Sequence, residues 1–156
     1  MREPLLSSLL NSSAPRATWL VRAILGAVFV SEGIQKFLFP DELGVGRFVK
    51  IGIPAPEVMA PFVGTVETVG GLFLILGLGT RLVAVPLLFS MLVAITSTKL
   101  VTFGKNGFWK TAHEARTDLL MIFGLLFLLA EGAGPLSLDA RLRRRRLESA
   151  GGHGGS

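Results

Sequence analysis

Six polar side chains in a largely apolar sequence have types and positions that could carry chemistry. The deepest is Glu67, which lies well inside the apolar stretch over residues 60–82. An ionisable group inside a lipid bilayer costs about 3 kcal/mol or more unless it is paired, so we expect it to face the protein interior. We interpret Glu67 as the candidate catalytic residue, because a buried carboxylate can hold and release a proton. The candidate substrate- or cofactor-binding residues are Glu32, Lys36, Lys99, Asp118 and His113.

The apolar stretches around these residues predict an all-α integral membrane protein, built as a four-helix bundle. About 20 mainly apolar residues cross the hydrocarbon core of a bilayer. We therefore expect spans over about residues 18–39, 60–79, 82–103 and 117–133. A polar tail at residues 1–16 precedes the membrane domain at residues 17–139, and a basic, then Gly-rich tail follows at residues 140–156.

The charged residues of the spans fall in the outer half of the predicted bundle. At about 1.5 Å per residue, Lys36, Lys99 and Asp118 lie about 2–6 Å below the outer membrane surface, and Glu32 and Glu67 about 10–13 Å below it. These five side chains could converge on a polar pocket that opens outward. Glu32 and Lys36 are also four residues apart, in the order that favours an ion pair. Alternatively, the charges only neutralise one another and fix the packing of the helices; the sequence leaves both interpretations open.

Small residues indicate which helix faces point inward. Gly64 and Gly71 stand three and four residues from Glu67, so they share its helix face. Gly26 and Gly33 form a similar seam on the first span. Because small residues let helices approach closely in lipid, we expect these faces to pack and Glu67 to point inward.

The composition excludes several kinds of protein. The chain has no cysteine, which excludes disulfides, thiol chemistry and thiolate-bound metal centres within it. Its two histidines are His113, in a predicted loop, and His153, in the Gly-rich tail, so we predict no bis-histidine haem in the membrane and no metal site. The net charge of +5 is matched by the arginine run formed by Arg141, Arg143, Arg144, Arg145 and Arg146. Such a run beside a membrane indicates contact with anionic lipid rather than with nucleic acid.

The positive charges also predict the orientation in the membrane. Four spans place both termini on one side, and lysine and arginine favour the cytoplasmic side. The arginine run would lie there together with Arg16 and Arg81, although Lys105 and Lys110 make the loop on the opposite side basic as well. We therefore expect both termini to be cytoplasmic.

The order of these features resembles the DoxX family of small four-helix bacterial membrane proteins. The resemblance rests on RAILGAVFVSEGIQKF, with Arg22, Gly33 and Lys36, on VETVGGLFLILGLGTR, with Glu67, Gly70, Gly71 and Gly77, and on GPLSLD after the fourth span. It covers roughly residues 17–139. It implies a four-helix bundle in the bacterial plasma membrane, with Lys36 and Glu67 as the leading polar site residues.

The resemblance also implies a link to redox chemistry. The family takes its name from a subunit of an archaeal thiosulfate:quinone oxidoreductase, and other members are associated with membrane redox or oxidative-stress complexes. Nothing in this sequence identifies a thiosulfate site, and the absence of cysteine excludes a persulfide on this chain.

Three functions fit these observations. The first is a component of a membrane redox system that binds a quinone-like molecule, with lysine or histidine donors and a carboxylate that relays protons. The second is an accessory or assembly subunit, whose redox partner protein performs the chemistry. The third is a carrier for a small solute or a proton, which four short spans could form only as a homo-oligomer.

Overall fold

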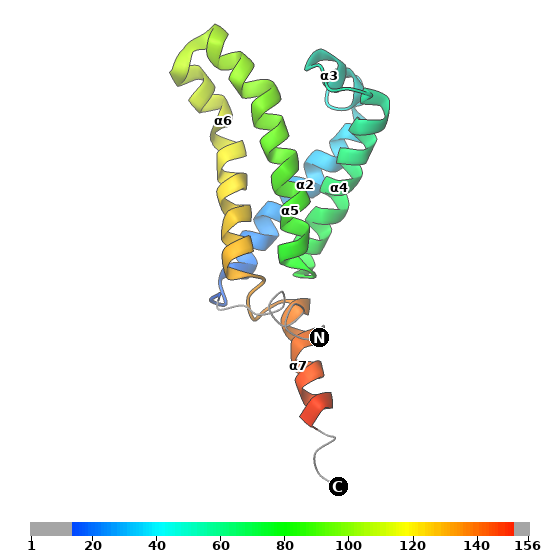
Figure 1. The fold of residues 1–156 in the computed structure, drawn as a ribbon, viewed down its shortest axis with the longest axis vertical. Coiled ribbons are helices and arrows are strands. Elements are labelled where there is room, and N and C mark those ends of the chain that lie inside the picture. Colours follow the sequence, from blue (N-terminus) through cyan, green and yellow to red (C-terminus); the bar gives the residue numbers. More distant parts are fainter. Residues whose placement is uncertain (1–13, 152–156) are drawn as a thin grey trace.

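The computed structural model describes residues 14–151, which form an all-α structure (Figure 1). Most of the predicted N-terminal tail and residues 152–156 lie outside the described residues. The long helices are α2 (Thr18–Leu38), α4 (Pro56–Leu76), α5 (Thr80–Ala94) and α6 (Leu100–Glu131). The shorter elements are α3 (Val45–Lys50), a π-helical turn (Ile95–Lys99) and α7 (Leu138–Gly151).

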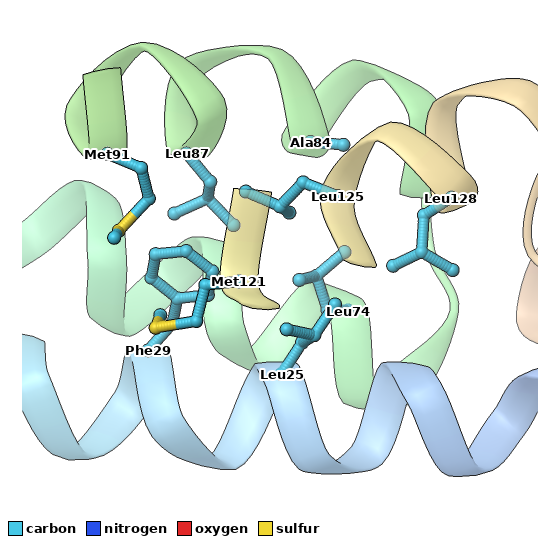
Figure 2. Close-up of a cluster of buried hydrophobic side chains, with 9 residues drawn as sticks. All are labelled: Leu25, Phe29, Leu74, Ala84, Leu87, Met91, Met121, Leu125 and Leu128. Carbon is cyan, nitrogen blue, oxygen red and sulfur yellow. The ribbon is translucent and has the colours of Figure 1, made fainter. Parts of the chain in front are cut away.

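The four long helices lie alongside one another, whereas α7 extends away from one end of them (Figure 1). The start of α2, the turn between α4 and α5 and the end of α6 all lie near α7, and α3 lies at the opposite end. The four helices share one apolar core, which Figure 2 shows from close by. The core residues are Leu25, Phe29, Leu74, Ala84, Leu87, Met91, Met121, Leu125 and Leu128.

The helices α2 and α4 approach closely because glycines face each other between them. A Cβ atom added to Gly33 would lie 2.6 Å from the carbonyl oxygen of Gly64, and one added to Gly26 would lie 2.5 Å from that of Gly71. Both distances are far inside normal contact, so the two helix backbones touch at these positions. The two glycine seams that the sequence indicated thus pack against each other.

The helix boundaries differ from the predicted ones mainly in the second half of the chain. The predicted span over residues 82–103 is divided into α5, the π-helical turn and the start of α6. The predicted loop over residues 104–116 is helical, apart from a break at Gly107, where φ is 77° and ψ is 173°. Polar residues alone do not end a helix, and one glycine at positive φ is enough to reverse the chain. The helix α4 also begins four residues earlier than predicted, with Pro56 in its first turn.

Two segments of the described chain are long and apolar enough to cross a membrane, namely Pro56–Leu76 and Thr80–Lys99. The sequence predicted four such spans. The helix α2 has the length of a span, but it carries Arg22, Glu32 and Lys36, and α6 begins with the polar residues of the predicted loop. In α2, the neighbouring helices cover Arg22 and Lys36, whereas Glu32 is exposed.

The predicted basic tail is helical as well. The Ser137 hydroxyl oxygen accepts a hydrogen bond of 3.1 Å from the Ala140 N–H, which caps the start of α7. The arginines of α7 are exposed over the whole of its described length.

The glycine seam gives a first testable prediction. Gly33→Ala should destabilise the protein by about 1–3 kcal/mol, because the added methyl group forces α2 and α4 apart. Gly104→Ala is the matched control, since a Cβ atom at this helical glycine meets nothing within 4 Å. Thermal unfolding in detergent compares the two variants. Equal stability of both would show that the close approach contributes nothing.

Candidate functional site

The centre of the candidate site is an ion pair between two long helices. The Lys36 Nζ on α2 lies 2.5 Å from Oε2 of Glu67 on α4. The other carboxylate oxygen of Glu67, Oε1, accepts a hydrogen bond of 2.9 Å from the Ser90 hydroxyl on α5. The Lys36 ammonium group donates a further bond of 3.3 Å to the Glu32 carbonyl oxygen. Three helices therefore meet at one carboxylate.

This site is almost closed to solvent. The side chain of Glu67 is 7% exposed and that of Lys36 is 12% exposed. Lys36 continues the buried stripe of α2 through Phe29 and Gly33, and Glu67 lies on the glycine-rich face of α4. Since each helix turns once in 3.6 residues, these spacings direct both side chains into the space between the helices.

The electrostatics of the pair follow from its burial. A carboxylate removed from water loses several kcal/mol of hydration, which a close ammonium group and additional hydrogen bonds must offset. Glu67 has a donor on each oxygen, so its negative charge is compensated from two sides. The structure thus holds the Glu67 carboxylate between a charged donor on α2 and a neutral donor on α5.

Lys99 and Asp118 form a second, more open pair. The Lys99 Nζ lies 3.7 Å from Oδ2 of Asp118, and the two side chains are 19% and 25% exposed. Lys99 is the last residue of the π-helical turn, and π-helical turns occur frequently at functional sites. This pair contacts water more readily than the Lys36–Glu67 pair does.

Two of the predicted site residues lie outside both pairs. The Glu32 side chain is exposed, and Lys36 bonds to the backbone carbonyl oxygen of Glu32 and to the Glu67 carboxylate. The predicted ion pair between the side chains of Glu32 and Lys36 is therefore wrong. His113 is exposed on α6, where Nη1 of Arg116 lies 2.7 Å from its Nδ1. Of the five charged residues that were predicted to converge, the structure pairs four, as Lys36–Glu67 and Lys99–Asp118, and leaves the Glu32 side chain exposed.

Sequence reasoning missed one member of the site, Ser90. The sequence feature that could have indicated Ser90 is its hydroxyl side chain within the apolar stretch of α5. Counting 1.5 Å per residue from the predicted end at residue 103 puts Ser90 about 20 Å deep, well below Glu67. The apolar span ends at Lys99 in the structure, four residues before the predicted end, so that count overestimates the depth.

A second buried polar cluster lies at the other end of the helices. Arg22 is only 2% exposed and donates a hydrogen bond of 2.5 Å from Nη2 to the Leu136 carbonyl oxygen. The Asp139 carboxylate accepts bonds of 2.7 Å and 3.1 Å from the N–H groups of Gly79 and Thr80. Glycine is required nearby at Gly77, where φ is 66° and a Cβ atom would overlap the Arg22 guanidinium. This cluster fastens the start of α7 to the turn between α4 and α5.

Among residues 14–151, no group of three or more histidine, aspartate or glutamate side chains comes together as a possible metal site. The acidic residues of the two ion pairs are already neutralised by lysine.

The ion pair gives a second testable prediction. Lys36→Met should destabilise the protein by about 3 kcal/mol, because Glu67 remains buried without its ammonium partner. The double variant Lys36→Met, Glu67→Leu should recover most of that loss, since no charge is then left in the interior. Chemical unfolding in detergent measures both. A double variant less stable than Lys36→Met would contradict the pairing.

Comparison with known proteins shows to which family this chain belongs. The DoxX family model matches residues 17–103. A protein of Mycobacterium tuberculosis (strain ATCC 25618 / H37Rv) named "Uncharacterized membrane protein Rv3486" is 51% identical over 143 residues, which cover 88% of each chain. A protein of Bacillus subtilis (strain 168) named "Putative oxidoreductase CatD" is 31% identical over 130 residues, which cover 83% of this chain and 90% of that one. No solved structure matches the chain. The resemblance seen in the sequence is thus confirmed, and the chain is a membrane protein of the DoxX family.

Proposed function

We propose that this protein is a component of a membrane redox system, and that its Lys36–Glu67 site binds the head group of a quinone-like molecule. The observation that carries the proposal is a buried carboxylate with a lysine and a serine as partners on two other helices. The B. subtilis relative that is named an oxidoreductase supports a redox role. Family membership fits the same role.

The chemistry of a quinone matches the groups at this site. The two oxygens of a quinone accept hydrogen bonds, and the Lys36 ammonium group and the Ser90 hydroxyl are donors. Reduction of a quinone also takes up two electrons and two protons. Glu67 is the group that can supply a proton inside the protein. The chain has no cysteine, so thiol chemistry of its own cannot supply the electrons, and we assign their supply to a redox partner protein.

Binding at this site requires the ion pair to open. Both donors, Lys36 and Ser90, are bonded to Glu67 in the structure. When Glu67 takes up a proton it loses its negative charge, and the Lys36 ammonium group is free to bond to another acceptor. In this mechanism, proton uptake by Glu67 and hydrogen bonding to the ligand are coupled steps. The half-buried Lys99–Asp118 pair is the proposed contact with water, from which protons enter.

The proposed arrangement in the membrane is a four-helix bundle in the bacterial plasma membrane. The two apolar spans, Pro56–Leu76 and Thr80–Lys99, would cross it together with α2 and the second part of α6. Arg22 and Lys36 of α2 would face the other helices. The arginines of α7 favour a cytoplasmic position for this end of the protein, and both termini with it.

The second candidate function is an accessory subunit without a ligand of its own. The observation that favours it is that both oxygens of Glu67 already have partners within the protein. In that case the ion pair only fixes the packing of α2, α4 and α5. A variant that separates ligand binding from folding distinguishes the two functions.

Quinone binding gives a third testable prediction. The detergent-purified protein should retain quinone from the membrane and bind an added short-chain quinone. Lys36→Gln should weaken this binding about tenfold, because the quinone oxygen loses its hydrogen bond to a charged donor. Extraction of bound lipids and fluorescence titration measure the two quantities.

The control for this experiment is Glu32→Gln. It removes one carboxylate from the same region, but Glu32 is exposed. It should bind quinone as the parent does. Absence of quinone binding in the parent, or equal losses in both variants, would overturn the proposal and favour the accessory role.

A further inference from the structure

The helix α7 carries a concentration of positive charge that its own structure does not neutralise. Five arginines, namely Arg141, Arg143, Arg144, Arg145 and Arg146, are exposed within this helix of 14 residues. Like charges three or four residues apart destabilise a helix. A helix of this composition is therefore stabilised by a negatively charged surface beside it.

The first turn of α7 is held at a defined position. The Asp139 carboxylate accepts hydrogen bonds from the N–H groups of Gly79 and Thr80, which form the turn between the two apolar spans. Just before α7, the Leu136 carbonyl oxygen accepts a bond from the buried Arg22. The end of the first span, the start of the second span and the start of α7 are thus at the same level. The first of the arginines, Arg141, follows two residues after Asp139.

This level corresponds to the head-group layer of a membrane crossed by the two spans. The head groups occupy about 5–8 Å on each side of the hydrocarbon core. At 1.5 Å per residue, Arg141 lies about 3 Å and Arg145 about 9 Å beyond Asp139 along the helix. Figure 1 shows α7 leaving the end of the long helices in this direction.

Three of the arginines share one face of the helix and line a groove. Arg141, Arg144 and Arg145 are spaced three and four residues apart, so they lie on the same side of α7. With Pro135, Ala140 and Glu148 they line a groove of about 430 Å³. Guanidinium groups bind phosphate oxygens through paired hydrogen bonds. We propose that this groove binds the phosphate of an anionic phospholipid in the adjacent membrane leaflet.

Two observations favour a lipid over a nucleic acid as the occupant. Leu142 and Leu147 are 43% and 64% exposed among the arginines, and apolar side chains suit the boundary of a membrane rather than a polyanion. Glu148 in the groove interrupts its basic lining, which suits a single phosphate better than a continuous row of phosphates. The proposal is independent of the quinone site.

The test compares two double variants of the full chain in detergent micelles. Arg144→Gln, Arg145→Gln removes two charges from the groove face. Arg143→Gln, Arg146→Gln removes two charges from the same helix without changing the residues that line the groove. Intact-protein mass spectrometry counts bound phosphatidylglycerol and phosphatidylcholine with identical acyl chains, and circular dichroism with thermal unfolding verifies that both variants fold.

The parent should bind phosphatidylglycerol in preference to phosphatidylcholine. The groove variant should lose about tenfold in apparent affinity for it, and the control variant no more than about twofold. Equal losses in both variants, or no preference in the parent, would overturn the proposal. The overall positive charge of α7, and not the groove, would then determine lipid binding. Displacement of the lipid by inorganic phosphate or a short oligonucleotide at the same phosphate concentration would overturn a lipid as the occupant.

Discussion

The structure depends on how one buried carboxylate is compensated. Glu67 lies inside an apolar helix, where an unpaired charge would be costly, and its partners come from two other helices. Lys36 can reach it only because Gly33 and Gly64 let α2 and α4 touch. The ion pair and the glycine seam therefore act together, since a larger side chain in the seam would pull the lysine away from the carboxylate.

The polar cluster around Arg22 and Asp139 has a different character from the Lys36–Glu67 pair. It binds mostly backbone groups, namely a carbonyl oxygen and two N–H groups at a turn, so it can change little without breaking the fold. The Lys36–Glu67 pair joins side chains that could exchange partners. The apolar core around Phe29 and Leu74 lies between the two clusters along α2 and α4. The end beside α7 thus anchors the fold, and the opposite half holds the ion pair to which we assign the proposed chemistry.

The sequence predicted much of this arrangement, because spacing along a helix reports which residues share a face. The glycines at positions 64 and 71 indicated that Glu67 points inward, and the order of the motifs indicated the family. Depth along the membrane normal was a weaker guide, because it carries no information on direction around the helix axis. Glu32 was placed in the predicted pocket on that basis, yet its side chain is exposed. The helical segments on either side of Gly107 could not be predicted either, since polar residues and glycine are typical of loops and helix ends alike.

The most direct measurement of the central claim is infrared difference spectroscopy of the protein in lipid, recorded as an added quinone is reduced. If Glu67 supplies a proton, one carboxyl group changes its protonation state when the quinone is reduced, and this signal is absent in Glu67→Gln but present in Glu32→Gln. A spectrum with no carboxyl signal, or one that persists in Glu67→Gln, would contradict a proton-carrying role for Glu67. The Lys36–Glu67 pair would then be a purely structural element of the fold.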